Sequence, residues 1–382
     1  KALCDGKIDA FGYSVGFPNG AMEQAATCAA KASPINLTGP EVQGLIDGAD
    51  YYAQAVIPKG TYTKQKKDAT TFGVKATVVT SAYVSDDLVT SDIAYFAALD
   101  AISSSNINKE ELDYIIVAHN FGDVKSDNKK SDIVPSLAAR VKHKLAIENP
   151  NCVAYDLPFG CPGWLQGIIQ ADYFIKSGDA KKILVIGSEI LSRVSDPHDR
   201  DSMLYADGAG ATILEAKESD SPIGILAHKT RSDTFEYSQM LHMDKSYNVN
   251  EDNKNDIFLK MNGRKLYQYA LEKVPQAIKD VLEKSATHIS KITKVLIHQA
   301  NGKMDDAILK RLFRLYDMVD LPKNIMPMTI EWLGNSSVAT VPTLLDLIMK
   351  GKMDLHSINK GDTLVFASVG AGMNINALVY QM

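Results

Sequence analysis

The sequence predicts an α/β protein in which a series of strands and helices occurs twice between about residue 90 and the C-terminus. Nearly continuous apolar runs are typical of strands that are covered on both faces, and three of them lie at 114–118, 152–155 and 183–187. A helix is expected at 162–177, with Gly178 as its stop signal. The second series comprises strands expected at 223–227, 295–297 and 363–368 and helices expected at 264–284, 303–316 and 338–349.

Local signals also predict elements before the first series and a link between the two series. Residues 7–15 are strand-like and 20–32 form an Ala-rich helix pattern. A new helix is expected to begin near Thr90, because Thr90 or Ser91 can cap it. The apolar positions of that helix, at helical spacing, are Ile93, Phe96, Ala97 and Ala101. The polar segment 217–222 is expected to link the two series.

Composition excludes several classes of protein. Of 382 residues, 45% are hydrophobic and 23% charged, and no apolar run is long enough to cross a bilayer, so we expect a soluble globular chain. A net charge of −5 argues against a general nucleic-acid binder. The four cysteines form no CxxC pair and have no histidine at zinc-ligand spacing, so neither a metal site nor a disulfide framework is expected. The chain starts with Lys1 and shows no targeting leader.

Cys161 lies in the segment 156–164 (DLPFGCPGW), after an expected strand and before an expected helix. Unpaired N–H groups and the helix dipole stabilise an anion at such a position and can lower a thiol pKa from ~8.5 by one unit or more. Pro162 suits the first helical position. The alternative is that Cys161 is simply a small buried apolar residue.

Other candidate residues also lie where strands end. His298 follows an apolar strand in 295–301 (VLIHQAN), and Asn335 lies in 332–342 (WLGNSSVATVP) before a helix. Gly370 and Gly372, after another strand, can bring backbone N–H groups close to a ligand oxygen. Taken singly, each of these residues has an ordinary structural explanation, such as a helix cap for Asn335.

Together, these segments resemble the ketoacyl synthase III branch of the thiolase superfamily over roughly residues 86–382. The resemblance also includes 187–192 (GSEILS), 199–201 (DRD) and 206–211 (ADGAGA). It implies a thiolase-like fold of two similar halves in α-β-α-β-α layers, with the first half incomplete at its N-terminus. The implied divisions of the chain are 1–85, 86–218 and 219–382.

The resemblance also implies a reaction. Cys161 would take an acyl group from a coenzyme A or carrier-protein thioester. His298 and Asn335 would then assist the decarboxylation of a malonyl thioester, and Gly370 would form an oxyanion hole with the Cys161 N–H. The product would be a 3-oxoacyl thioester of fatty acid or polyketide biosynthesis, with no cofactor needed. Asn335 favours decarboxylation, since a general base there would suit other condensations. A non-decarboxylating acyltransferase is the alternative.

Partners and pocket residues are expected on the same basis. Lys303, Lys310 and Arg314 share one helix face, which is either a docking site for the acidic acyl carrier protein or an ordinary solvated surface. The resemblance implies a homodimer in the cytoplasm, with no nucleic-acid or membrane partner. The acyl pocket would include Phe159 and Trp164, and Val134 would help to shape it across the dimer interface. His119 and His198 are expected to be structural.

Residues 1–85 do not fit this family. They resemble the C-terminal part of a periplasmic solute receptor of the TRAP transporter TAXI type, and alone would suggest a receptor fragment. The segments that carry this resemblance are 3–10 (LCDGKIDA), 16–20 (GFPNG), 37–40 (LTGP), 51–53 (YYA) and 71–76 (TFGVKA). The two resemblances meet near 84–89, which suggests a chimeric or misassembled reading frame. We therefore expect low stability and impaired substrate entry.

Overall fold

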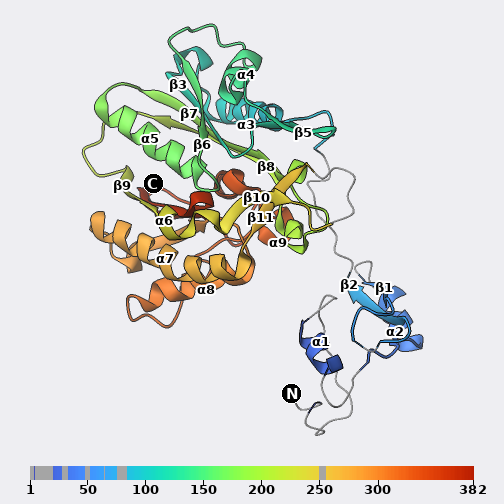
Figure 1. Cartoon of the computed structure of the whole chain (residues 1–382). Helices are drawn as coiled ribbons and strands as arrows, with labels where there is room; N and C mark the ends of the chain where they lie inside the picture. Colours follow the sequence, from blue (N-terminus) through green and yellow to red (C-terminus); the bar gives the residue numbers. More distant parts are fainter. Residues whose placement is uncertain are drawn as a thin grey trace. The chain divides into compact units, whose positions relative to one another are not determined.

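The chain forms two compact units, Lys1–Val78 and Val79–Met382 (Figure 1). In this computed structural model, the described residues are Cys4, 20–27, 33–47, 52–63, 65–74, 84–248 and 255–382. No helix among them is long and apolar enough to cross a membrane.

The first unit contains two short helices and one antiparallel strand pair. Strand β1 pairs with β2, with Tyr52 opposite Val74 and Ile57 opposite Ala69. The elements are α1 (Gly20–Thr27), α2 (Pro40–Asp47), β1 (Tyr52–Ile57) and β2 (Ala69–Val74). The helix expected at 20–32 is thus observed to Thr27, while the rest of it and the strand expected at 7–15 lie outside the described residues.

The expectation of no disulfide is wrong for this first unit, because Cys4 is disulfide-bonded. Cys152 and Cys161, in the second unit, are free thiols. Spacing alone could not reveal the bond, since it depends on which cysteines the fold brings within about 6 Å of one another between their Cα atoms.

The second unit is built on two four-stranded sheets with the orders β6-β3-β7-β8 and β12-β13-β14-β9. In the first sheet β3 runs parallel to β6 and β7, and β8 runs antiparallel to β7. In the second, β12 and β13 are parallel, and β14 and β9 alternate in direction. The strands are β3 (Tyr114–His119), β6 (Val153–Pro158), β7 (Lys182–Ile190), β8 (Asp207–Glu215), β9 (Gly224–Ser232), β12 (Ile292–Ile297), β13 (Thr363–Gly370) and β14 (Asn374–Gln381).

The two sheets repeat one arrangement, which confirms the predicted thiolase-like duplication. The parallel pair β3–β7 followed by antiparallel β8 corresponds to β12–β13 followed by β14. The outer edge of β14 is covered by β9, whereas β8 pairs only with β7 within the described part of the chain. Among the described residues, no strand of the first half thus corresponds to β9 of the second.

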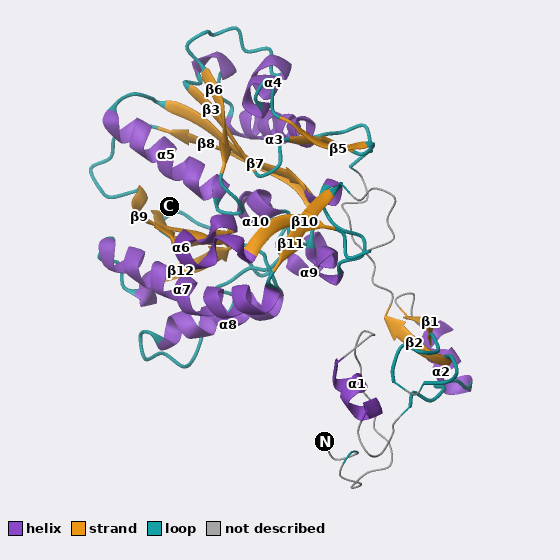
Figure 2. Cartoon of the chain, viewed as in Figure 1, coloured by secondary structure: helices purple, strands orange, loops and turns teal. Residues whose placement is uncertain are grey.

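Helices separate and cover the sheets in five layers (Figure 2). Helices α3 and α4 pack on the outer face of the first sheet. Helices α5 and α10 lie between the sheets, and α7 and α8 cover the outer face of the second. These helices are α3 (Thr90–Ser105), α4 (Leu137–Lys144), α5 (Gly163–Ser177), α7 (Gly263–Lys284), α8 (Gly302–Arg314) and α10 (Thr340–Met349). The smaller elements are β4 (Asp123–Lys125), β5 (Asn128–Asp132), α6 (Thr234–Tyr237), β10 (Leu241–Lys245), β11 (Ile257–Met261) and α9 (Ile330–Leu333).

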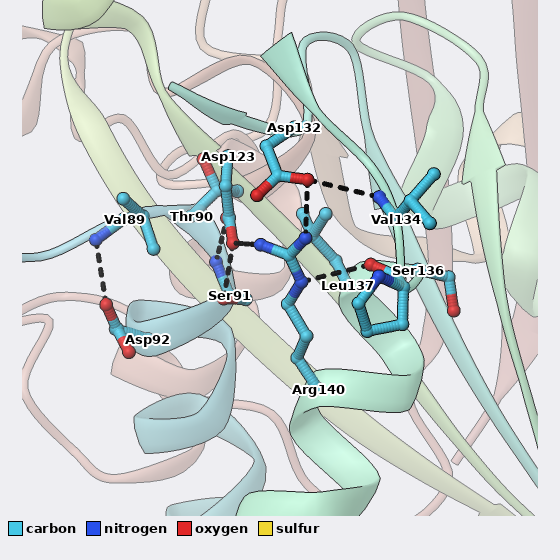
Figure 3. A network of polar contacts seen from close by, with 12 residues as sticks. Val89, Thr90, Ser91, Asp92, Asp123, Asp132, Val134, Ser136, Leu137 and Arg140 are labelled. Atoms are coloured by element: carbon cyan, nitrogen blue, oxygen red, sulfur yellow. Dashed lines mark hydrogen bonds and ion pairs between the residues drawn. The ribbon is translucent and has the colours of Figure 1, made fainter. Parts of the chain in front are cut away.

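The start of α3 differs from the prediction, because neither Thr90 nor Ser91 caps it. Val89 precedes the helix, and its N–H donates to the Asp92 carboxylate at 2.9 Å. Both the N–H and the hydroxyl of Ser91 donate to Asp123 at 2.7 Å. Figure 3 shows how Arg140 then joins Asp123 to Asp132. The first turn of α3 is thereby tied to α4 and to the β5 hairpin.

The buried face of α3 was also predicted wrongly. Ala94 and Ala98 are fully buried, whereas Phe96, expected to face the core, is 51% exposed. Small side chains let a helix approach a sheet closely, so the alanines rather than the large residues face β8 and β7.

Candidate active site

Cys161 lies between β6 and α5, close to the turn that ends β13. Gly160 has a φ of +68°, a left-handed conformation that favours glycine. A Cβ on Gly370 would lie 2.6 Å from the backbone nitrogen of Cys161, so only glycine allows this approach. The structure thus places Gly370 against Cys161. The helix begins at Gly163, one residue later than expected, with Pro162 as the preceding residue.

Ser337 provides the contact to the sulfur. Its hydroxyl donates to the Cys161 Sγ at 3.3 Å. Its backbone has a φ of +54°, which costs about 1 kcal/mol or more for a residue with a Cβ. The N–H of Ser337 donates to the Asn335 Oδ1 at 2.9 Å, which stabilises the turn. Asn335 is therefore linked to Cys161 through one residue.

His298 joins the same turn from the end of β12. Its Nδ1 lies 2.7 Å from the Thr340 hydroxyl, and that hydroxyl lies 3.1 Å from the Ser337 carbonyl oxygen. His298 is only 4% exposed. One short segment, Asn335–Thr340, thus contains one of the three residues predicted to react and hydrogen-bonds to the other two, Cys161 and His298, which are far from it in the sequence.

The ionisation of the site differs from the prediction. Burial raises the pKa of the Cys161 thiol to about 11; the Ser337 hydroxyl acts to lower it and the Glu189 carboxylate to raise it further. The expected lowering of the pKa is therefore wrong for the free protein, because desolvation outweighs the helix N-terminus. Burial lowers the pKa of His298 to about 4, so its imidazole is neutral at pH 7.

Sequence reasoning missed three neighbours of this centre. Asn120 follows β3 directly, and its Nδ2 donates to the Ser337 Oγ at 3.0 Å and to the Glu189 carboxylate. Burial raises the pKa of Glu189 to about 7, although hydrogen bonds from Asn120 act against that rise. Asn120 could have been found from the sequence in the same way as His298, because each is a polar residue directly after a buried strand. Glu189 lies in 187–192, which was noted only for its resemblance, and Ser337 lies in 332–342, which was noted only for Asn335.

The predicted acyl-pocket residues have different surroundings. Val134 is 82% exposed on the loop after β5. Trp164 is buried between the sheets, with its ring centroid 6.2 Å from that of Phe366. Phe159 lies in the segment between β6 and Cys161. Within one chain, Trp164 lines a groove between α5, α10 and the strands, and Val134 is not among the residues that line it.

The remaining predicted residues are placed as follows. Lys303, Lys310 and Arg314 are all exposed on α8, and Lys310 pairs with Asp306 one turn earlier. His119 is buried, and its Nε2 lies 3.1 Å from the Asp156 carboxylate. The Nε2 of His198 lies 3.2 Å from the Asn248 side-chain nitrogen. Both histidines have contacts of the kind that fix loops.

Comparison with known proteins decides the family. A family model described as 3-oxoacyl-(acyl-carrier-protein) synthase III matches residues 155–234, and the model of its C-terminal part matches 282–382. Beta-ketoacyl-(acyl-carrier-protein) synthase III 1 of Vibrio vulnificus (strain YJ016) is 35% identical over 283 residues, which cover 74% of this chain and 80% of the relative. The chain belongs to the β-ketoacyl-(acyl-carrier-protein) synthase III family.

Other members of this family agree. The synthase III of Xanthomonas campestris pv. campestris is 31% identical over 76% of this chain and 82% of its own. The crystal structure of 3-oxoacyl-(acyl-carrier-protein) synthase III from Aquifex aeolicus superposes with a TM-score of 0.64 at 29% identity, covering 78% of this chain and 85% of that one. The Thermus thermophilus structure gives 0.65 at 28% identity, covering 78% and 86%.

The N-terminal segment matches a different family. A model described as the NMT1-like family covers residues 1–94. This match includes the whole first unit and extends a few residues into α3, and it ends well before residue 155, where the first synthase III match begins.

Proposed function

We propose that the chain is a condensing enzyme that joins an acyl thioester to a malonyl thioester with loss of carbon dioxide. The observation that carries this proposal is the Asn335–Thr340 segment, which hydrogen-bonds to Cys161 and His298 and contains Asn335 itself. The proposed nucleophile, imidazole and carboxamide are thereby connected through one segment, which supports acyl transfer followed by enolate stabilisation.

In the first step, the Cys161 sulfur attacks the carbonyl carbon of an acyl thioester. The backbone N–H groups of Cys161 and Gly370 would stabilise the resulting oxyanion, and the close approach of Gly370 to the Cys161 nitrogen supports this role. The C–S bond of the donor breaks, and the proton of Cys161 leaves on the departing thiol. The acyl group is then stored as a thioester on Cys161.

In the second step, the C–C bond to the carboxylate of a bound malonyl thioester breaks and leaves an enolate. Neutral donors suit its oxygen, and burial keeps His298 neutral. The Oδ1 of Asn335 already accepts the Ser337 N–H, so the carboxamide presents its N–H groups elsewhere. The enolate carbon attacks the acyl carbon on Cys161, and the Cys161 thiolate leaves and takes up one proton.

The test uses an acyl thioester together with malonyl thioester labelled in the free carboxyl group. We expect labelled carbon dioxide and a 3-oxoacyl thioester, identified by mass spectrometry, with both lost in Cys161→Ala and kept in Cys152→Ala. Asn335→Asp should reduce carbon dioxide release more than acylation of Cys161. Acyl transfer without carbon dioxide release would instead support the non-decarboxylating acyltransferase and reject the proposed function.

The partners follow from this chemistry. We propose an acyl carrier protein or coenzyme A as the carrier of both substrates, no cofactor, and a cytoplasmic site of action where such thioesters are made. A homodimer is also proposed, supported by the exposed apolar residues Ile133 and Val134 on one loop. Size-exclusion chromatography with light scattering tests the dimer.

For residues 1–85 we propose a receptor-derived segment joined to the synthase III unit. Its disulfide-bonded Cys4 supports this, since disulfides are typical of proteins outside the cytoplasm. Sequencing genomic DNA across codons 75–95 in the source organism tests the join. A continuous, uninterrupted frame would establish a natural fusion, and a break there would establish a misassembled one.

A further inference from the structure

Ser337 is the side chain that contacts the Cys161 sulfur, and its hydroxyl has a defined direction. Asn120 Nδ2 donates to the Ser337 oxygen at 3.0 Å, so that oxygen accepts from one side. The single hydroxyl hydrogen is then free to point to the Cys161 Sγ, 3.3 Å away. A hydrogen-bond donor at this distance stabilises a thiolate more than a thiol.

Asn120 is in turn held by Glu189. The Glu189 Oε2 accepts from the Asn120 backbone N–H at 2.9 Å and from the Nδ2 of the same residue. Glu189 is completely buried, and the backbone N–H of Phe121 also acts on its carboxylate. A buried carboxylate therefore lies two hydrogen bonds away from Ser337 and close enough to the nucleophile to affect its pKa.

The surroundings of Glu189 contain few other charges. His119 on β3 is the ionisable neighbour that favours its charged form, and Cys161 is the one whose thiolate opposes it. On β8 the opposite residue is Gly208. On the α3 side, the carbonyl of Thr90 accepts from the hydroxyl of Ser188, the residue before Glu189 in β7. The charge of Glu189 thus acts on the sulfur with little compensation.

We propose that Ser337 is a positioning residue that stabilises the Cys161 thiolate, that Asn120 and Glu189 hold its hydroxyl in the donating orientation, and that the Glu189 charge opposes thiolate formation. The inference rests on the proposed function, because it concerns the same nucleophile. The two effects on the thiolate have opposite signs, which makes them separable. Removing the hydroxyl disfavours the thiolate, whereas removing the charge favours it.

The test measures the rate of iodoacetamide alkylation of Cys161 against pH in the full-length protein, read by mass spectrometry of the Cys161 peptide. We expect Ser337→Ala to shift the profile to higher pH by about one unit, which means roughly tenfold slower alkylation at a fixed pH below the pKa. Glu189→Gln should shift the profile to lower pH, because it removes the negative charge that opposes the thiolate. The glutamine oxygen can still accept from Asn120, so the orientation of the Ser337 hydroxyl is kept.

Ser336→Ala is the matched control, because its side chain lies next to Gly208 rather than at the sulfur. Its profile should coincide with that of the unmodified protein. Ser337→Gly, which tolerates the positive φ, should reproduce the shift if Ser337→Ala folds poorly. Coinciding profiles for the Ser337 variants and the control, or a Glu189→Gln shift to higher pH, would overturn the inference. Loss of condensation with these shifts intact would reject only the proposed function.

Discussion

At the scale of single residues, the contact between His298 and Thr340 decides which imidazole nitrogen can donate. If the Thr340 hydroxyl donates to Nδ1, the proton of the neutral ring is on Nε2, which can then bind an enolate oxygen. If the hydroxyl donates to the Ser337 carbonyl instead, Nδ1 carries the proton. The 2.7 Å contact to Nδ1 is a hydrogen bond in both arrangements, whereas the 3.1 Å contact to the Ser337 carbonyl is one only in the second. The proposed role of His298 requires the first arrangement, because only there does Nε2 carry a hydrogen.

Replacing this hydroxyl should therefore affect decarboxylation specifically. We expect Thr340→Val to reduce carbon dioxide release from malonyl thioester by roughly ten- to a hundredfold, as for the loss of one donor to a developing oxyanion. The alkylation rate of Cys161 should not change. Thr343→Val, one turn further along α10, is the control. Equal carbon dioxide release by the two variants would contradict this tautomer.

A buried ion pair makes the second residue-scale prediction. Lys260 on β11 pairs with Asp196, lies 3.5 Å from Asp199, and has its ammonium 3.7 Å from the centre of the Tyr247 ring. Lys260 and Asp196 are 2% and 0% exposed. Lys260→Met leaves buried carboxylates without a cation and should lower the free energy of unfolding by about 3–5 kcal/mol.

Urea denaturation measures this loss, and the double variant Lys260→Met with Asp196→Asn should be less destabilised than Lys260→Met alone. The pH dependence has a defined sign. Burial alone would raise the pKa of Asp196, but hydrogen bonds, that from Lys260 foremost, lower it to about 2. The pair's stabilisation is therefore present above about pH 4, the unfolded pKa, and is lost as the pH falls towards 2. A double variant no more stable than the single one would contradict the pairing.

Local sequence patterns picked out three residues that the structure connects, but they did not predict the environment of these residues. Cys161, His298 and Asn335 each follow a buried strand or precede a helix, which local pattern reveals. The contacts from Ser337 to Cys161 and Asn120 span 176 and 217 residues of sequence, so no local pattern could place them. The rise in the thiol pKa depends on burial, and burial is set by the packing of both halves.

At the scale of elements, α8 combines an apolar buried side with an exposed basic one. Lys303 and Arg314 are exposed on the predicted docking face, while Lys310 is already paired with Asp306. We expect Lys303→Glu and Arg314→Glu each to raise the KM for carrier-protein thioesters several-fold at low salt, because charge reversal weakens the encounter with an acidic partner. Lys310→Glu should have a smaller effect, since its charge is partly used.

The comparison with coenzyme A thioesters is the control for α8. The KM for these substrates should stay unchanged in all three variants, since no carrier protein takes part. Equal effects on the KM of both substrate types would show that the substitutions disturb the fold and not the docking of the carrier protein. The sequence predicted that these three basic residues share one face of α8. It did not predict the ion pair between Lys310 and Asp306.

At the scale of the whole molecule, the two halves of the synthase III unit are unequal. Strand β14 has five consecutive buried residues, Ile375–Val379, and it pairs along both edges, with β13 and with β9. In β8, the corresponding strand, only Asp207 and Gly210 are buried. A groove of about 820 Å³ is lined by residues of β8, α3 and α10 together with residues of α5, β9, β13 and β14. The less buried β8 strand and its single described partner are what the predicted gap in the first half would produce.

This asymmetry leads to a prediction about local opening. An edge strand presents unpaired N–H groups, and regions with few buried contacts open at low free energy. We therefore expect amides in Asp207–Glu215 to exchange hydrogen for deuterium faster than those in Asn374–Gln381 in the full-length protein, measured by mass spectrometry. Peptides from β7 and β13, which have partners on both sides, are the internal control and should be protected alike. Equal protection of β8 and β14 would mean that a segment outside the described residues covers the β8 edge, and the expected low stability would then lose its physical basis.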